Sequence, residues 1–121
     1  NTVMKNKLIV FFVFLSFNLV AQSFVSPINY VDNELNNKKV VSFIKERVKD
    51  NASANGIYDA STISKMEKEN WKAFKKLTKV SNTTLLESII KDYSKNWYYN
   101  YSEILTLYKW EEKKAKKPKK I

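Results

Sequence analysis

Six lysines between residues 61 and 80 are the side chains whose spacing most clearly suggests a function. The stretch also holds two glutamates, so its net charge is +4. At about 100° per residue of a helix, the lysines fall within about 100° of arc, opposite Phe74. A strip of one sign can attract anionic polymers, lipid phosphates or an acidic protein, and it can equally be a solvated face. The six are Lys65, Lys68, Lys72, Lys75, Lys76 and Lys79.

The C-terminal stretch EEKKAKKPKKI carries the second concentration of positive charge. Residues 113–121 hold six lysines, whereas residues 22–112 have a net charge of only +2. No aromatic residue is interleaved with these lysines for base stacking, which argues against nucleic acid as a partner. We expect a disordered basic tail, with docking to an anionic envelope surface as the functional alternative. Its candidate contacts are Lys113, Lys114, Lys116 and Lys117.

The composition excludes several classes of catalytic site. The chain has no histidine and no cysteine, which removes the usual zinc ligands and the Ser-His and Cys-His nucleophile pairs. A single glycine, Gly56, argues against glycine-rich phosphate-binding loops and dinucleotide sites. We therefore expect no enzyme activity, no metal and no cofactor. A hydrolase built on two carboxylates stays open, because the fold alone can bring two acids together.

Aromatic residues gather in NWYYNYSEILTLYKW, which holds six of them. If this region is one continuous helix, Trp97, Tyr101 and Tyr108 lie on its apolar stripe. Tyr99 and Trp110 then share the opposite, polar face, three turns apart. We predict that this exposed pair contacts a protein or sugar partner. The alternative is packing of both rings against another helix.

The sequence pattern predicts that helices position these side chains. One glycine and two prolines are too few turn formers for a multi-stranded sheet. A first helix is expected over about residues 33–50, where Val40, Val41, Ile44 and Val48 share a face. Residues 51–56 form a loop, in which Gly56 suits a left-handed turn.

The second and later helices follow from apolar periodicity. Ser61 or Ser64 is the expected cap of the second helix. Its apolar stripe consists of Ile63, Met66, Phe74 and Leu77, with Trp71 at the edge.

A further capping box, Thr84 with Glu87, precedes an apolar period that runs from Leu86 to Tyr108. This period favours one helix over residues 84–114, while the alternative is two helices broken near Asn100, with Ser102 capping the second. EILTLYKW is also rich in strand-forming residues, which leaves a strand there as a further alternative.

The N-terminal stretch MKNKLIVFFVFLSFNLVAQSF resembles a bacterial secretory signal peptide. Lys5 and Lys7 supply its positive region, residues 8–15 its apolar run, and small residues a cleavage site after Ala21 or Ser23. An uncleaved anchor is the alternative, but the 13 residues from Leu8 to Val20 span only about 20 Å as a helix. The absence of cysteine fits an exported bacterial protein better than a disulfide-rich animal one.

Together these features predict an all-α protein with three segments. These are a cleavable signal peptide at residues 4–21, a small three- or four-helix bundle at 22–112, and a lysine-rich tail at 113–121. We expect export to the periplasm or medium, with no transmembrane segment after cleavage. The expected function is non-enzymatic binding to an anionic envelope polymer or an acidic protein, and the alternative is a secreted effector or inhibitor of one specific protein.

Overall fold

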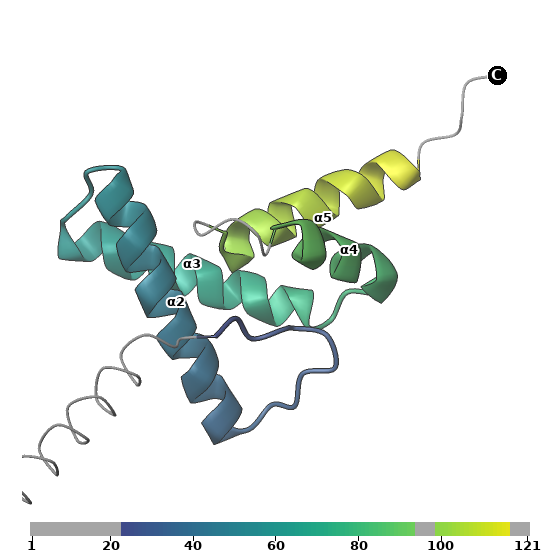
Figure 1. Ribbon diagram of the computed structural model, residues 1–121, viewed down its shortest axis with the longest axis horizontal. Coiled ribbons are helices and arrows are strands. Elements are labelled where there is room, and N and C mark those ends of the chain that lie inside the picture. The colour runs from purple at the N-terminus through teal and green to yellow at the C-terminus, as the bar shows by residue number, and fades with distance from the viewer. Residues whose placement is uncertain (1–22, 94–98, 117–121) are drawn as a thin grey trace, which may run out of the picture.

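The computed structural model describes residues 23–93 and 99–116, and the elements below are labelled as in Figure 1. The described residues form four helices and no strand. These are α2 (Glu34–Ala54), α3 (Ala60–Leu77), α4 (Thr83–Tyr93) and α5 (Tyr101–Ala115). The all-α class and the small helical bundle are therefore confirmed. The predicted signal peptide lies outside the described residues.

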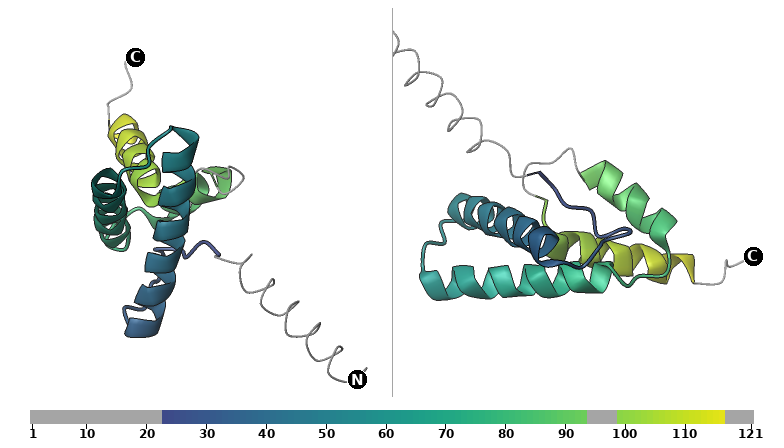
Figure 2. Two further views of the ribbon diagram at one scale, coloured as in Figure 1. Left: turned by 90° about the vertical axis from the view of Figure 1, so that its left-hand side faces the viewer. Right: turned by 90° about the horizontal axis from the view of Figure 1, so that it is seen from below.

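Helix α3 is the centre of the arrangement. It packs against α2 on one side and against α5 on another, while α4 packs on α5. Figure 1 shows α3 crossing α2 obliquely, and a short turn after α2 joins the two helices (Figure 2). In that turn Gly56 has φ +69°, so the predicted left-handed position is confirmed. Helix α2 continues to Ala54, four residues beyond its expected end.

The core consists of one cluster to which every helix contributes. From α2 it takes Val40, Ile44 and Val48, as predicted, and also Phe43. The fourth residue of the predicted α2 face, Val41, is instead 37% exposed. The remaining fully or largely buried side chains come from α3, α4, α5 and the segment just before α5: Ala73, Phe74, Leu77, Leu86, Ile89, Tyr99, Tyr101, Ile104 and Tyr108.

The segment before α2 is fixed to this core by aromatic contacts. The Phe24 ring lies 5.4 Å from that of Tyr101, and the Tyr30 ring meets Phe74 edge to face at 4.8 Å. The Tyr101 hydroxyl donates a hydrogen bond to the Val25 carbonyl oxygen at 2.7 Å. Residues 23–33 are thus part of the folded domain.

Asparagine and aspartate cap the helices, in place of the serines and threonine that the sequence suggested. Asn82 Oδ1 accepts from the Leu85 N–H of α4 at 3.0 Å, and Asn100 Oδ1 accepts from the Glu103 N–H of α5 at 2.9 Å. Asn100 has an extended backbone, with φ −145° and ψ 168°. The favoured single helix over residues 84–114 is therefore wrong, as is a strand at EILTLYKW. The alternative break near Asn100 is confirmed, with Asn100 itself as the cap.

Asp59 caps α3, so neither Ser61 nor Ser64 does. Its carboxylate accepts hydrogen bonds from the Thr62 hydroxyl and from the Thr62 N–H at 3.0 Å. These bonds, the hydroxyl first, lower the pKa of Asp59. An acid with a lowered folded-state pKa stabilises the fold above its unfolded pKa, and this contribution is lost as the pH falls through the folded value.

Replacing Asp59 with asparagine is expected to flatten the acid limb of the stability profile. Asparagine caps helices about as well as aspartate, so the N-cap bonds are kept while the titrating group is removed. Below the unfolded pKa of about 3.9, the native chain should lose stability more steeply than Asp59→Asn. Urea unfolding at a series of pH values measures this, and parallel acid limbs would contradict it.

A buried asparagine links α3 to α5. Asn70 is 5% exposed, and its Nδ2 donates to the Met66 carbonyl oxygen at 2.9 Å. Its Oδ1 accepts from the Ser102 N–H in the first turn of α5 at 3.3 Å. Both functions of the amide are thereby used, as a buried polar group requires. Among the described helices, none has the length and apolar character needed to cross a membrane.

Candidate functional site

All six lysines singled out by sequence are exposed in the structure. Lys65, Lys68, Lys72, Lys75 and Lys76 lie on α3, and Lys79 follows its end. Within residues 23–93 and 99–116, none of the six lies within 4 Å of a carboxylate oxygen. Their ammonium groups are therefore exposed and lack carboxylate partners in this part of the chain.

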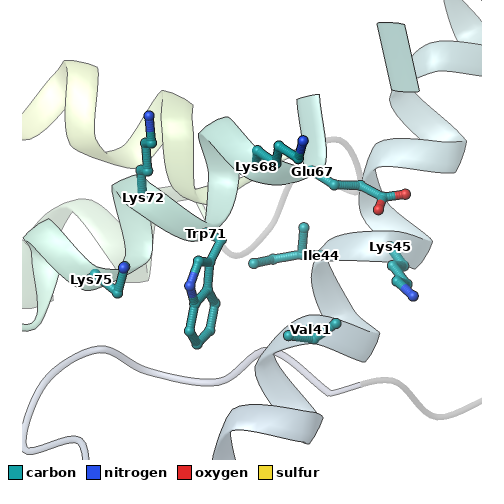
Figure 3. A pocket seen from close by; sticks show the side chains of 8 residues that line it. All are labelled: Val41, Ile44, Lys45, Glu67, Lys68, Trp71, Lys72 and Lys75. Carbon is teal, nitrogen blue, oxygen red and sulfur yellow. The ribbon is translucent and has the colours of Figure 1, made fainter. Parts of the chain in front are cut away.

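Three of these lysines border a groove between α2 and α3. The groove has a volume of about 350 Å³. Figure 3 shows the Trp71 indole projecting from α3 into the space between the helices, with Ile44 and Val41 of α2 facing it. The lining residues are Val41, Ile44, Lys45, Glu67, Lys68, Trp71, Lys72 and Lys75.

The groove combines an apolar floor with a cationic rim. Its floor consists of Trp71, Val41 and Ile44, whereas its rim holds four lysines and one acid, Glu67. Lys45 belongs to α2 and the other lysines belong to α3, so both helices contribute positive charge to the rim of the groove. Lysine stems are themselves apolar, which lets these side chains extend the floor while the ammonium groups stay in water.

Trp71 contacts both an aromatic ring and a lysine of α3. It stacks on Phe74 with the ring centroids 5.9 Å apart and the planes 18° from parallel. The Lys75 ammonium group lies 5.9 Å from the indole centroid, a cation–π contact. Because Phe74 is 1% exposed, the indole stands on the rigid core and does not depend on a loop for its position.

A second hollow adjoins the groove and shares Trp71 and Lys75 with it. Its volume is about 330 Å³, and Tyr30, Lys79 and Asn37 are among its lining residues. The Tyr30 hydroxyl donates to Asn37 Oδ1 at 2.5 Å, which fixes this wall of the hollow. Neither hollow is lined by Lys65 or Lys76. The structure thus divides the six lysines into four that border these hollows and two that do not.

Sequence reasoning missed the contribution of α2 to this site. Val41 and Lys45 are four residues apart and therefore neighbours on one helix face. The sequence shows this spacing. Only the packing of α2 against α3 in the structure shows that this face lies opposite Trp71. Glu67, which lies on the same helix as most of the lysines, is also a member of the rim.

The predicted contact pair Tyr99 and Trp110 is not a shared surface. Trp110 is 57% exposed, but Tyr99 is only 7% exposed. The Tyr99 ring lies 5.2 Å from that of Phe24, and the Arg47 guanidinium stands 5.3 Å from its centroid. The expectation of a common exposed face is wrong because it required a continuous helix, and the chain is extended just before α5. Trp97, assigned to the same helix, lies outside the described residues.

The lysines of the predicted tail are partly helical. Lys113 and Lys114 belong to the last turn of α5, and Lys116 is its C-cap, so disorder from residue 113 onward is contradicted. Lys114 pairs with Glu111 at 3.7 Å and lies 3.7 Å from the Trp110 centroid, while Lys116 pairs with Glu112 at 3.7 Å. Lys117 lies outside the described residues. These lysines are therefore less free than those of α3.

Two of the carboxylates in the described residues have structural partners. Asp59 is occupied as a helix cap, and Glu112 accepts from the Tyr108 hydroxyl at 2.9 Å. In the part of the chain that the structure covers, no group of three potential metal ligands occurs.

The chain matches no family model, no curated protein and no solved structure. Its function has to be argued from the groove and its lysines.

Proposed function

We propose that this protein is a small exported, non-enzymatic binding protein that attaches to anionic material of the bacterial envelope. The observation that supports this is the row of exposed α3 lysines without carboxylate partners among the described residues. A one-sign field of this kind raises the local concentration of anions and speeds their encounter with the surface. The lysines of the C-terminal end add to this field.

Lysine is well suited to such attachment. Its ammonium group is a flexible point charge, which meets anions of many geometries, whereas arginine suits bidentate recognition of one geometry. With a single arginine, Arg47, packed over the Phe43 and Tyr99 rings, the chain favours attraction to a class of anions over readout of one phosphate pattern.

Binding to an anionic polymer should depend strongly on salt. At about 0.1 M salt the Debye length is about 10 Å, and at about 1 M it is about 3 Å. We expect affinity for polyphosphate to fall at least about tenfold over this range. Equilibrium binding followed by fluorescence anisotropy of labelled polyphosphate measures it, and an unchanged affinity would refute the proposal.

Removal of residues 117–121 separates the contribution of the C-terminal end. The shortened chain keeps all of α5 and its ion pairs, so we expect it to fold. We expect weaker but still salt-dependent binding, because the α3 lysines remain.

A further inference from the structure

The groove offers two chemistries to a ligand, and an anionic polymer would use only one of them. Its lysines suit an anion, but its floor of Trp71, Val41 and Ile44 suits a hydrocarbon chain. We propose that the groove binds a single-chain anionic lipid, such as a fatty acid, with the chain on this floor and the head group among the lysines. This inference rests on the proposed function, because it uses the same α3 lysines.

The residues that the structure describes leave the apolar floor uncovered. Val41 is 37% exposed although it lies between the buried residues Val40 and Phe43 of α2. Trp71 is partly buried and cannot move into the core, since Phe74 already fills the space beneath it. A hydrocarbon chain lying in the groove would remove both side chains from water, which is favourable in proportion to the apolar area covered.

The rim selects a negative head group and gives it a direction. Four lysines against one glutamate leave a net rim charge of +3. Glu67 lies at one end of the groove with Lys45, whereas Lys72 and Lys75 lie on the far side of Trp71 (Figure 3). Repulsion from Glu67 therefore places the head group at the Lys72 and Lys75 end, beside the indole.

The size of the groove favours one chain over a larger partner. Small-molecule sites have volumes of about 300–1,000 Å³, and this groove, at about 350 Å³, is at the lower end. A helix is about 10–12 Å across, whereas an extended hydrocarbon chain is much narrower. A groove at the lower end of this range therefore suits a single extended chain better than a helix.

Titration with laurate below its micelle concentration tests the inference. A variant carrying Trp97→Phe and Trp110→Phe leaves Trp71 as the sole indole, so its fluorescence reports on the groove. We expect a saturable shift with laurate, a much weaker one with octanoate, and none with the neutral detergent dodecyl maltoside. Calorimetry on the unmodified chain gives the same comparison without a reporter.

Val41→Gln and Val31→Gln form a matched pair of variants. Val41 lines the groove, whereas Val31 is 63% exposed and lines neither the groove nor the adjoining hollow. We expect Val41→Gln to weaken laurate binding about tenfold and Val31→Gln to leave it unchanged, with polyphosphate binding the same in both.

Equal binding of laurate and octanoate, equal affinity of the two valine variants, or binding to anionic vesicles without binding of monomeric laurate would each overturn the lipid assignment. If polyphosphate binding persists while laurate fails, only the lipid assignment is lost. If polyphosphate binding is absent or insensitive to salt, the proposed function fails as well.

Discussion

Tyr101→Ala is expected to lower the free energy of unfolding by about 3–5 kcal/mol, the usual range for truncating a buried large aromatic side chain. Tyr101 is fully buried and lies where the entry segment, α2 and α3 meet. Its ring contacts those of Phe24 and Phe43, each at 5.4 Å, and that of Phe74 at 4.8 Å. A domain of this size has a stability of roughly 5–10 kcal/mol, so the variant should be close to unfolding.

Tyr101→Phe isolates the hydroxyl from the ring. The hydroxyl donates to the Val25 carbonyl oxygen, and burial raises the pKa of Tyr101 far above its usual range, so it remains a donor at any working pH. Loss of one such bond should cost about 1 kcal/mol. Since the acceptor belongs to the entry segment, amide hydrogen exchange should accelerate at residues 24–30 before it does elsewhere.

Urea unfolding followed by circular dichroism measures both variants. Tyr58→Ala is the matched control, because Tyr58 is 75% exposed and its truncation should change the stability by no more than about 0.5 kcal/mol. A Tyr101→Ala variant as stable as this control would mean that the entry segment does not pack on the core as described.

The helical class and most core positions were predictable because they depend on local pattern. Leu86, Ile89, Tyr101, Ile104 and Tyr108 follow one period and are all buried. That same regularity concealed the break at Asn100, since a single phase can continue across two helices that pack on one core. The sequence analysis allowed a break near Asn100 but assigned the cap to Ser102, whereas Asn100 itself is the cap.

Local sequence patterns could not predict the contacts between segments that are far apart in the chain. The place of Tyr99 in the core depends on extended backbone before α5 and on the Phe24 ring, 75 residues earlier in the chain. A helical wheel places every residue on a helix, so it assigned Tyr99 to the wrong side.

The candidate site also has one part that the sequence predicted and one part that it did not. The α3 lysine row is a property of one helix and was found from sequence. The groove depends on which face of α2 lies against Trp71, and this is determined by how α2 and α3 pack together. The contribution of Lys45 to the rim therefore became visible only in the structure.

Reversal of three rim charges, Lys68→Glu, Lys72→Glu and Lys75→Glu together, is expected to have the largest effect on binding. A lysine near an anionic surface contributes about 1 kcal/mol, so the loss of three weakens binding by roughly a hundredfold. The added glutamates repel the anion and lower the affinity further. Binding to polyphosphate and to laurate should both fall, because the two ligands share these lysines.

The fold should tolerate this change. All three lysines are exposed, and none takes part in an ion pair among the described residues. The triple substitution removes the cation–π interaction between Lys75 and the Trp71 ring, for which about 0.5–1 kcal/mol is typical at an exposed site. Circular dichroism and urea unfolding should therefore show a folded variant, so that weaker binding is not a consequence of unfolding.

A second triple variant separates the lysine face from the overall charge. Lys39→Glu, Lys49→Glu and Lys109→Glu change the net charge by the same amount, at exposed positions that line neither the groove nor the adjoining hollow. If the α3 face is the binding surface, this control should keep most of its affinity, since screening limits the reach of distant charges. Equal losses in the two variants would show that binding follows net charge alone, and the groove would then have no special role.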